Sequence, residues 1–422
     1  MELDADFKQQ GASFSGFTIS TAFGQFMVLL FSFLLVRYFG PEISGEYTTA
    51  YTLTTLTSIA FNLGLDTWML RAGALSKKPK ETLGNVLRIK IIAGLIWAVL
   101  LLGIASSLKP ELYPAPLLAI CIIDVWFDSV LITALAVLNI QRKIKHYSWL
   151  ILLSRGLKLL GLIALMFFAN RNLIVFAGWR ALCSVVFALI ALMLLKPDFG
   201  NKLPTQTSEI LGQSRSFALS ELLSTIYMHV DVVILSNIKG VFATGIYSPA
   251  LSLVNALFVL PNALYSYFIP SLSRWFSSNQ TKFLELAKKV LVLLTILGAV
   301  LSLGIGLLGK PLTGLLLGES FKPSGELMVK LSPILFLKSL EFGFAAIIVA
   351  TNKQKTRLIP QTVAALASII LNLLLIPYLG ESGAALVYLI TELILFVSYG
   401  IIAFNMLKLV RRTSAGKTEE PV

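Results

Sequence analysis

The sequence predicts an all-α polytopic membrane protein with about twelve transmembrane helices. Hydrophobic residues make up 56% of its 422 residues, charged residues make up only 14%, and the mean hydropathy is +0.81. A soluble domain has about 25% charged residues, and a helix needs roughly 20 apolar residues to cross the hydrocarbon core. The apolar runs are continuous rather than alternating, so they favour helices over the strands of a membrane barrel.

Twelve apolar runs are long enough to be these helices. In chain order they cover approximately residues 14–36, 45–65, 84–107, 116–139, 147–169, 173–195, 210–236, 242–267, 285–309, 326–350, 358–379 and 383–407. The longest connections, at about 66–83 and 268–284, are too short for a folded domain. We therefore expect the functional residues to lie within the spans.

The distribution of Lys and Arg predicts that both termini are cytoplasmic. With this orientation the large majority of loop cations, such as Lys77, Lys78, Arg142 and Lys353, fall on the inside. Cytoplasmic loops carry such an excess of positive charge. The net charge of +13 thus reflects topology, and we expect no nucleic-acid partner because no soluble basic domain is present.

Metal and cofactor sites are not expected. The two cysteines, Cys121 and Cys183, lie inside apolar runs and are interpreted as small buried hydrophobic residues. The only histidines, His146 and His229, are too few for a metal cluster.

An internal repeat relates the two halves of the chain. Residues 40–47, GPEISGEY, match residues 240–247, GVFATGIY, at an offset of 200 that pairs Gly40 with Gly240, Gly45 with Gly245 and Tyr47 with Tyr247. The offset spans six helices, so both copies have the same orientation and form a parallel pseudo-two-fold repeat. We predict two six-helix lobes, 1–205 and 206–409, and a disordered cytoplasmic tail at 410–422. The two tyrosines are expected to anchor the hairpins at the membrane interface.

Three stretches resemble the Wzx-like oligosaccharide flippases of the polysaccharide biosynthesis family. They are FLLVRYFGPEISGEYTTAYTL, STIYMHVDVVILSNIKGVFATGIYSPALSLVNAL and IIVATNKQKTRLIPQTVAALASIILNLLLIPYLGESGAALVYLITE. This family is part of the multidrug/oligosaccharidyl-lipid/polysaccharide (MOP) exporter superfamily. The resemblance implies a MATE-like fold in which two lobes surround a central cavity.

The same resemblance implies a function. It implies that undecaprenyl-pyrophosphate-linked oligosaccharide repeat units cross the bacterial inner membrane by alternating access, for synthesis of O-antigen, capsule or exopolysaccharide. Membrane lipids, a polysaccharide polymerase and a chain-length regulator are the implied partners.

Five cations within the predicted spans are candidates for binding the pyrophosphate headgroup: Arg155, Lys158, Arg180, Lys90 and Lys338. Desolvated Arg and Lys bind phosphate strongly. Arg155 and Lys158 are three residues apart and therefore share one helix face. Two alternatives remain open: Lys90 lies near the cytoplasmic end and can reach the interface, and Lys338 can form an ion pair with Glu341 three residues away.

Four acidic residues within the spans are candidates for ion coupling or for pairing with cations: Asp231, Glu341, Asp124 and Asp128. Asp124 and Asp128 share a face of the fourth predicted span and would pair well with the cations of the fifth. For Asp231, both the binding of a proton or cation and the pairing with an arginine are open.

Three other functions are compatible with parts of the sequence but less favoured than transport of a lipid-linked sugar. A multidrug antiporter that exports organic cations would have the same fold, but the excess of intramembrane cations disfavours it. A lipid II flippase would share the cationic cavity, although such proteins typically have about fourteen spans. A membrane enzyme of polysaccharide assembly is less favoured, because neither histidine lies in a catalytic constellation and no GxxxxGK[ST] loop is present.

Overall fold

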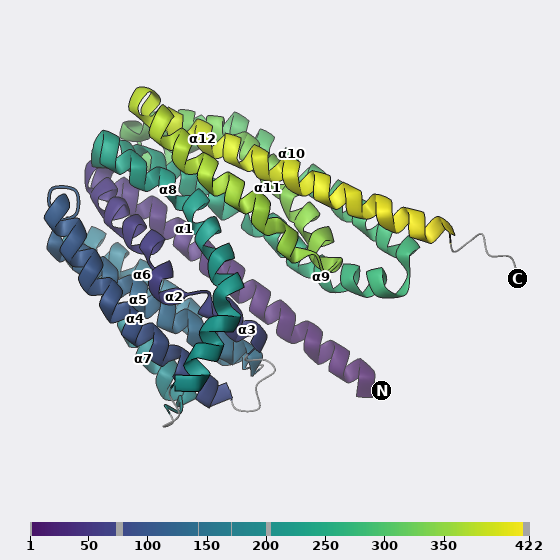
Figure 1. Cartoon of the computed structure of the whole chain (residues 1–422). Coiled ribbons are helices and arrows are strands. Elements are labelled where there is room, and N and C mark those ends of the chain that lie inside the picture. The colour runs from purple at the N-terminus through teal and green to yellow at the C-terminus, as the bar shows by residue number, and fades with distance from the viewer. Residues whose placement is uncertain (1, 73–78, 142, 170, 200–203, 417–422) are drawn as a thin grey trace, which may run out of the picture. The chain divides into compact units, whose positions relative to one another are not determined.

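The fold is built from helices, and the computed structural model describes residues 2–72, 79–141, 143–169, 171–199 and 204–416. No β-strand occurs in these ranges. The helices, labelled in Figure 1, are α1 (Glu2–Thr57), α2 (Ile59–Asn62), α3 (Leu65–Ala72), α4 (Pro79–Leu108), α5 (Ala115–Ile140), α6 (Ile144–Phe167), α7 (Leu173–Leu195), α8 (Pro204–Leu257), α9 (Val259–Ser278), α10 (Gln280–Leu317), α11 (Lys322–Ala350) and α12 (Leu358–Gly416). Two 3-10 turns, Glu319–Phe321 and Gln354–Arg357, precede α11 and α12.

The fold class predicted from the sequence is confirmed, since nine described helical segments are long and apolar enough to cross a membrane. Three of these segments, Phe23–Asn62, Phe217–Ser278 and Gln354–Arg412, contain 40, 62 and 59 residues. A span needs only roughly 20 residues, so each of the three is long enough for two. Each also contains a break with positive φ, at Gly40, Gly240 and Gly380. Division at these breaks is consistent with twelve spans, and the number twelve stays a prediction.

The two copies of the repeat have the same backbone conformation. Gly40 has φ 78° and ψ 175°, and Gly240 has φ 85° and ψ −178°. Glycine adopts this region readily, whereas a residue with a Cβ atom does so only with strain. A second interruption follows in both copies, where α2 begins at Ile59 and α9 begins at Val259, again 200 residues apart. The matching geometry supports the repeat seen in the sequence.

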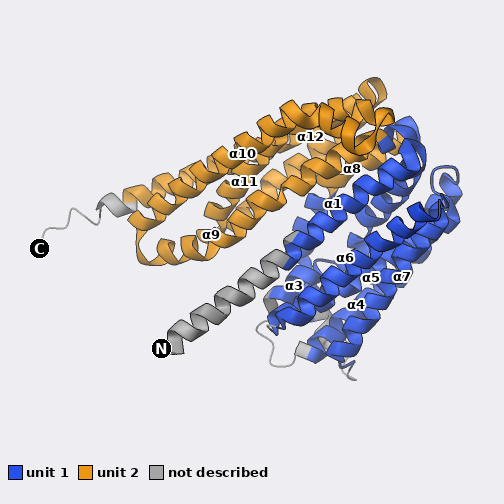
Figure 2. Cartoon of the chain, turned by 180° about the vertical axis from the view of Figure 1, so that it is seen from behind, with its two compact units in different colours: residues 1–225, 239–245 blue, residues 226–238, 246–422 orange. Residues whose placement is uncertain are grey.

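The chain forms two compact units, coloured in Figure 2. Unit 1 comprises residues 1–225 and 239–245, and unit 2 comprises residues 226–238 and 246–422. This division differs from the predicted boundary at 205/206, because α8 starts at Pro204 and its residues are shared between the units.

The chain termini differ in part from the sequence expectation. Within the predicted disordered tail at 410–422, residues 410–416 are helical and continue α12 as far as Gly416. Residues 417–422 lie outside the described part of the chain, as do Lys77, Lys78 and Arg142, which contributed to the predicted orientation.

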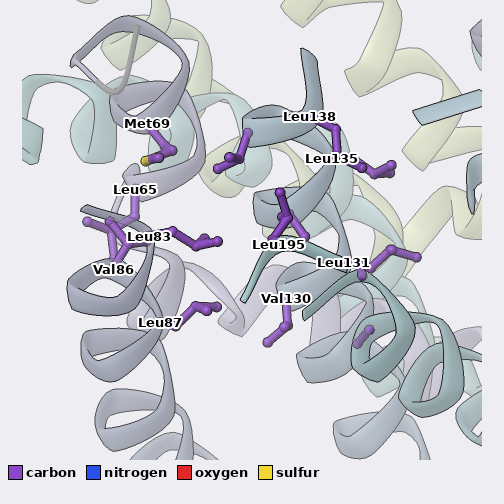
Figure 3. Packing of buried hydrophobic residues seen from close by; sticks show 14 of the residues in the cluster. Leu65, Met69, Leu83, Val86, Leu87, Val130, Leu131, Leu135, Leu138 and Leu195 are labelled. Atoms are coloured by element: carbon purple, nitrogen blue, oxygen red, sulfur yellow. The ribbon is translucent and has the colours of Figure 1, made fainter. Parts of the chain in front are cut away.

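Unit 1 has an extended apolar core, part of which is shown in Figure 3. Leu65 and Met69 of α3 pack with Leu83 and Leu87 of α4, all fully buried or nearly so. Side chains of α5, α6, α7 and α8 complete the cluster, including Val130, Leu131, Leu135, Leu138 and Leu195. This packing holds α5 in position, and α5 carries the two aspartates of the candidate site.

A reciprocal close contact joins the two copies of the repeat within unit 1. A Cβ atom on Gly45 would overlap the carbonyl oxygen of Val241, and a Cβ atom on Gly245 would overlap the carbonyl oxygen of Pro41. The obstructing atoms are backbone, so a side chain cannot be accommodated by a change of rotamer. The second glycine of the repeated pattern therefore permits close contact between two helix backbones.

We predict that Gly45→Ala and Gly245→Ala each destabilise the protein by about 1–3 kcal/mol or more, because the added methyl group overpacks this contact. The thermal midpoint of unfolding in detergent measures the effect. Gly103→Ala is the matched control, since a Cβ atom on this helical glycine has no neighbour within 4 Å. An equal midpoint for all three variants would contradict the prediction.

Candidate functional site

A cluster of five charged side chains lies between three helices of unit 1. Lys158 of α6 contacts both acidic residues of α5: its Nζ is 3.3 Å from Oδ1 of Asp124 and 2.9 Å from Oδ1 of Asp128. Arg180 of α7 contacts the other oxygen of Asp124 at 3.0 Å, and Arg155 of α6 lies 3.9 Å from Asp128. The expected pairing of Asp124 and Asp128 with the cations of the predicted fifth span is observed, and Arg180 joins the same cluster.

Arg180 is held on a second side by aromatic rings. Its Cζ atom lies 5.0 Å from the ring centre of Phe31, 5.6 Å from that of Tyr47 and 4.7 Å from that of Tyr51. A cation over an aromatic face is attracted by about 0.5–2 kcal/mol. Together with the Asp124 pair, these contacts make Arg180 part of the framework of unit 1.

Arg155 differs from the other two cations in access and in pairing. Its side chain is 26% exposed, against 5% for Lys158 and 10% for Arg180. Its single carboxylate contact, at 3.9 Å, is the longest of the cluster. Three cations face two carboxylates, so the cluster has a formal charge of +1, and Arg155 is the member best placed to offer that charge to an anion.

Lys90 of α4 is fully buried and belongs to a separate network in unit 1. Its Nζ lies 2.8 Å from Oδ1 of Asp66, and it donates hydrogen bonds of 2.8 Å to Ser129 and Thr133 of α5. Thr133 in turn donates to Asp66 at 2.6 Å. The alternative that Lys90 reaches the membrane interface is not observed, because its ammonium group is satisfied inside the helix bundle.

Unit 2 contains a charge cluster in which carboxylates outnumber cations, the reverse of the unit 1 cluster. Lys338 of α11 lies 3.2 Å from Oε2 of Glu341 on the same helix and 3.1 Å from Oε2 of Glu392 on α12. All three side chains are buried, and the Lys338 ammonium is 5.4 Å from the ring centre of Tyr227. One cation here faces two carboxylates. The intrahelical pair considered for Lys338 and Glu341 is present, with Glu392 as an additional partner.

Asp231 is buried in unit 2 without an arginine. The hydroxyl of Tyr247 donates to its Oδ2 at 2.6 Å, and the backbone N–H of Val232 donates to its Oδ1 at 2.8 Å. Among the described residues, no cationic group lies within ion-pair distance of Asp231. Of the two alternatives raised by the sequence, pairing with an arginine is therefore not observed.

The repeat tyrosines have different roles from those expected. Tyr47 is 4% exposed beside Arg180, and Tyr247 is fully buried against Asp231. The expectation that they anchor the hairpins at the membrane interface is wrong, because both rings are buried between helices. Asp66 and Glu392, which pair with Lys90 and Lys338, were not predicted from the sequence as site residues. The recurrence of Tyr at the same repeat position was the signal that could have revealed the two tyrosine contacts.

Comparison with known proteins identifies the family. Residues 11–276, well over half of the chain, match the model of a family described as "Polysaccharide biosynthesis protein". The chain belongs to this family. Its resemblance to that family, inferred from three sequence stretches, is thereby confirmed.

Two relatives match this chain along most of their own length. The "Capsular polysaccharide biosynthesis protein CapF" of Staphylococcus aureus is 23% identical over 405 residues, covering 90% of this chain and 95% of CapF. The "Putative O-antigen transporter" of Escherichia coli strain K12 is 26% identical over 370 residues, covering 85% of this chain and 88% of the transporter. The agreement thus extends well beyond the matched residues 11–276.

Two solved structures show the fold of this chain. An inward-facing multidrug resistance MATE family transporter of the MOP superfamily superposes with a TM-score of 0.70 at 17% identity, covering 92% of this chain and 96% of the transporter. The lipid II flippase MurJ, in an inward closed conformation, gives 0.68 at 13% identity, covering 94% and 90%. The MATE-like fold predicted from the sequence is confirmed.

We predict that Asp124→Asn destabilises the protein by about 3–5 kcal/mol, because it leaves Arg180 buried without a carboxylate and removes one of two from Lys158. The free energy of unfolding in detergent checks this. Glu326→Gln on α11 is the control, since Glu326 and its partner Lys310 are both 63% exposed and such pairs contribute about 0–1 kcal/mol. The prediction fails if the two variants lose similar stability.

Proposed function

We propose that this protein is a flippase that moves undecaprenyl-pyrophosphate-linked oligosaccharide repeat units across the bacterial inner membrane. The product would serve synthesis of a surface polysaccharide, namely O-antigen, capsule or exopolysaccharide. Membership of the polysaccharide biosynthesis family supports this proposal, as do the names of the two relatives, one from capsule synthesis and one an O-antigen transporter. Transport by alternating access, with both termini in the cytoplasm, is part of the proposal.

The charge surplus of the unit 1 cluster is the observation that carries this function. A pyrophosphate headgroup is an anion, and entering a membrane-spanning protein removes part of its hydration. A planar guanidinium group can bind phosphate oxygens with two hydrogen bonds. Arg155 has the exposure and the loose pairing for such an exchange, since only its 3.9 Å contact to Asp128 must be given up.

The remaining cations take supporting roles in this proposal. Lys158 and Arg180 compensate Asp124 and Asp128 and so position the face of α6 that carries Arg155. Lys90 and Lys338 are buried in their own networks and are not assigned to the first contact with cargo. A polysaccharide polymerase and a chain-length regulator remain the proposed partners, and membrane lipids would accommodate the undecaprenyl chain.

The test measures flipping in proteoliposomes that contain fluorescent undecaprenyl-pyrophosphate-linked sugars. We expect Arg155→Gln to lower the initial rate about 10- to 100-fold, because a hydrogen bond to a charged group contributes about 1.5–3 kcal/mol. Arg155→Lys should keep part of the rate, because it retains the charge but loses the bidentate geometry. Lys310→Gln, at an exposed ion pair, is the control and should match the wild type.

The outcomes separate the function from the site. Equal rates for wild type and Arg155→Gln would keep the flippase function but remove Arg155 from the cargo site. A folded wild type that fails to flip the lipid-linked glycan of its own organism, yet exports organic cations, would instead support the multidrug antiporter.

A further inference from the structure

One end of unit 2 combines exposed cations from helices that are far apart in the chain. This end comprises the junction of α9 with α10 and the last turns of α12, and Figures 1 and 2 both show these segments at the same end of the unit. Phe283 and Ala287 of α10 belong to the same buried cluster as Val410 of α12. The start of α10 and the end of α12 therefore share one region of the unit.

The first turns of α10 have one buried face and one charged face. Phe283 and Ala287 are fully buried and lie four residues apart, so they share a helix face. Lys282, Lys288 and Lys289 are exposed. Because the buried face is fixed by its packing, the three ammonium groups extend outward from a helix of defined position.

The last turns of α12 have the same two-faced pattern. Ala403 and Val410 are buried and lie seven residues apart, which places them two turns apart on one face. Lys408, Arg411 and Arg412 are exposed. Two helices thus present three exposed cations each at this end of unit 2, and both helices are held by the same apolar cluster.

These cations lie at the depth of lipid headgroups. On α10 they precede a continuous apolar run that starts at Val290. The 38 residues of α10 are about 57 Å long, which exceeds a bilayer of about 40–45 Å with its headgroups. The ring centre of Trp275, on α9, lies 4.7 Å from Nζ of Lys282. Trp is enriched at the membrane–water interface, so this pair marks the interface on the protein.

Carboxylates do not compensate these charges within the part of the chain that the structure describes. None of the six exposed cations of α10 and α12 forms an ion pair with a described residue. Glu285 is the one acidic residue within 280–289 and 403–416. The six cations therefore leave a positive surplus on an exposed surface.

The opposite end of unit 2 is arranged differently. There Lys310 of α10 lies 3.8 Å from Glu326 of α11, and Lys322 pairs with Glu319. Lys330 of α11 donates a hydrogen bond of 2.8 Å to Ser382. Cations at that end have partners within the protein, which makes them a matched comparison for the unpaired ones.

We propose that the unpaired cations bind anionic phospholipid headgroups of the adjoining leaflet. The surface they form, here called the basic platform, consists of Lys282, Lys288, Lys289, Lys408, Arg411 and Arg412. Clusters of Lys and Arg directly beside a membrane span attract anionic lipids, and Arg can bind a phosphate group with two hydrogen bonds. With the orientation proposed above, the leaflet is the cytoplasmic one.

The position of the basic platform favours a lipid over an acidic protein as its occupant. Its cations adjoin the apolar run of α10 without an intervening loop, so they lie where headgroups surround the helices. Leu409, between the cations of α12, is 68% exposed and offers an apolar contact beside them. A phospholipid supplies both an anionic group and an apolar chain at this depth.

The test uses the full chain in proteoliposomes with spin-labelled phosphatidylglycerol or phosphatidylcholine. The motionally restricted fraction of each label reports how strongly that lipid associates with the protein. We expect the wild type to prefer phosphatidylglycerol several-fold, and we expect high salt to reduce the preference by screening. The assay contains no cargo, so its result does not depend on the flippase function.

Two platform variants and one control variant each remove three positive charges. The α10 variant combines Lys282→Gln, Lys288→Gln and Lys289→Gln, and the α12 variant combines Lys408→Gln, Arg411→Gln and Arg412→Gln. We expect both to lose a large part of the preference. The control combines Lys310→Gln, Lys322→Gln and Lys330→Gln at the opposite end and should keep most of it. The thermal midpoint verifies that all three variants are folded.

Three results would overturn the proposal. The first is an unchanged preference in both platform variants. The second is an equal loss in the control variant, because lipid association would then follow net charge alone. The third is a wild type that does not distinguish the two headgroups, which would make an acidic protein the alternative occupant.

Discussion

Compensation of charge between neighbouring helices is the constraint on which this structure depends. Arg180 of α7 pairs with Asp124 of α5, Lys90 of α4 with Asp66 of α3, and Lys338 of α11 with Glu392 of α12. Each pair joins two helices whose other contacts are largely apolar. Within a membrane-spanning segment an unpaired charge costs about 2.5–3.5 kcal/mol or more. These pairs therefore restrict which helix faces can meet and in which register.

The two units place the cation and the carboxylate of such a pair on opposite helices. In unit 1 the carboxylate of the α5–α7 pair lies on α5, whereas in unit 2 the cation of the α11–α12 pair lies on α11. The surrounding groups increase the difference, since unit 1 adds two cations and one carboxylate, whereas unit 2 adds one carboxylate. Parallel repeats can thus keep a common helix arrangement while their buried clusters acquire different chemistry.

The repeated glycine and tyrosine pattern contributes both backbone shape and electrostatics. Gly40 and Gly240 allow the same left-handed break, and Gly45 and Gly245 allow backbone contact. The tyrosine two positions later then enters the helix packing, where the ring of Tyr47 faces Arg180 and the hydroxyl of Tyr247 donates to Asp231. A short hairpin signature therefore determines a break, a contact and a partner for a buried charge.

The sequence by itself determined the membrane-spanning helical class and the parallel repeat, because hydropathy and glycine spacing are local properties of the chain. It also nominated Arg155, Lys158, Asp124 and Asp128, since ionisable residues within apolar runs are few. Only the tertiary structure decided their roles, because the exposure of Arg155 and the burial of Lys158 depend on which helices pack against α6. The same holds for Glu392, whose closeness to Lys338, 54 positions earlier in the chain, results from the packing of α12 on α11.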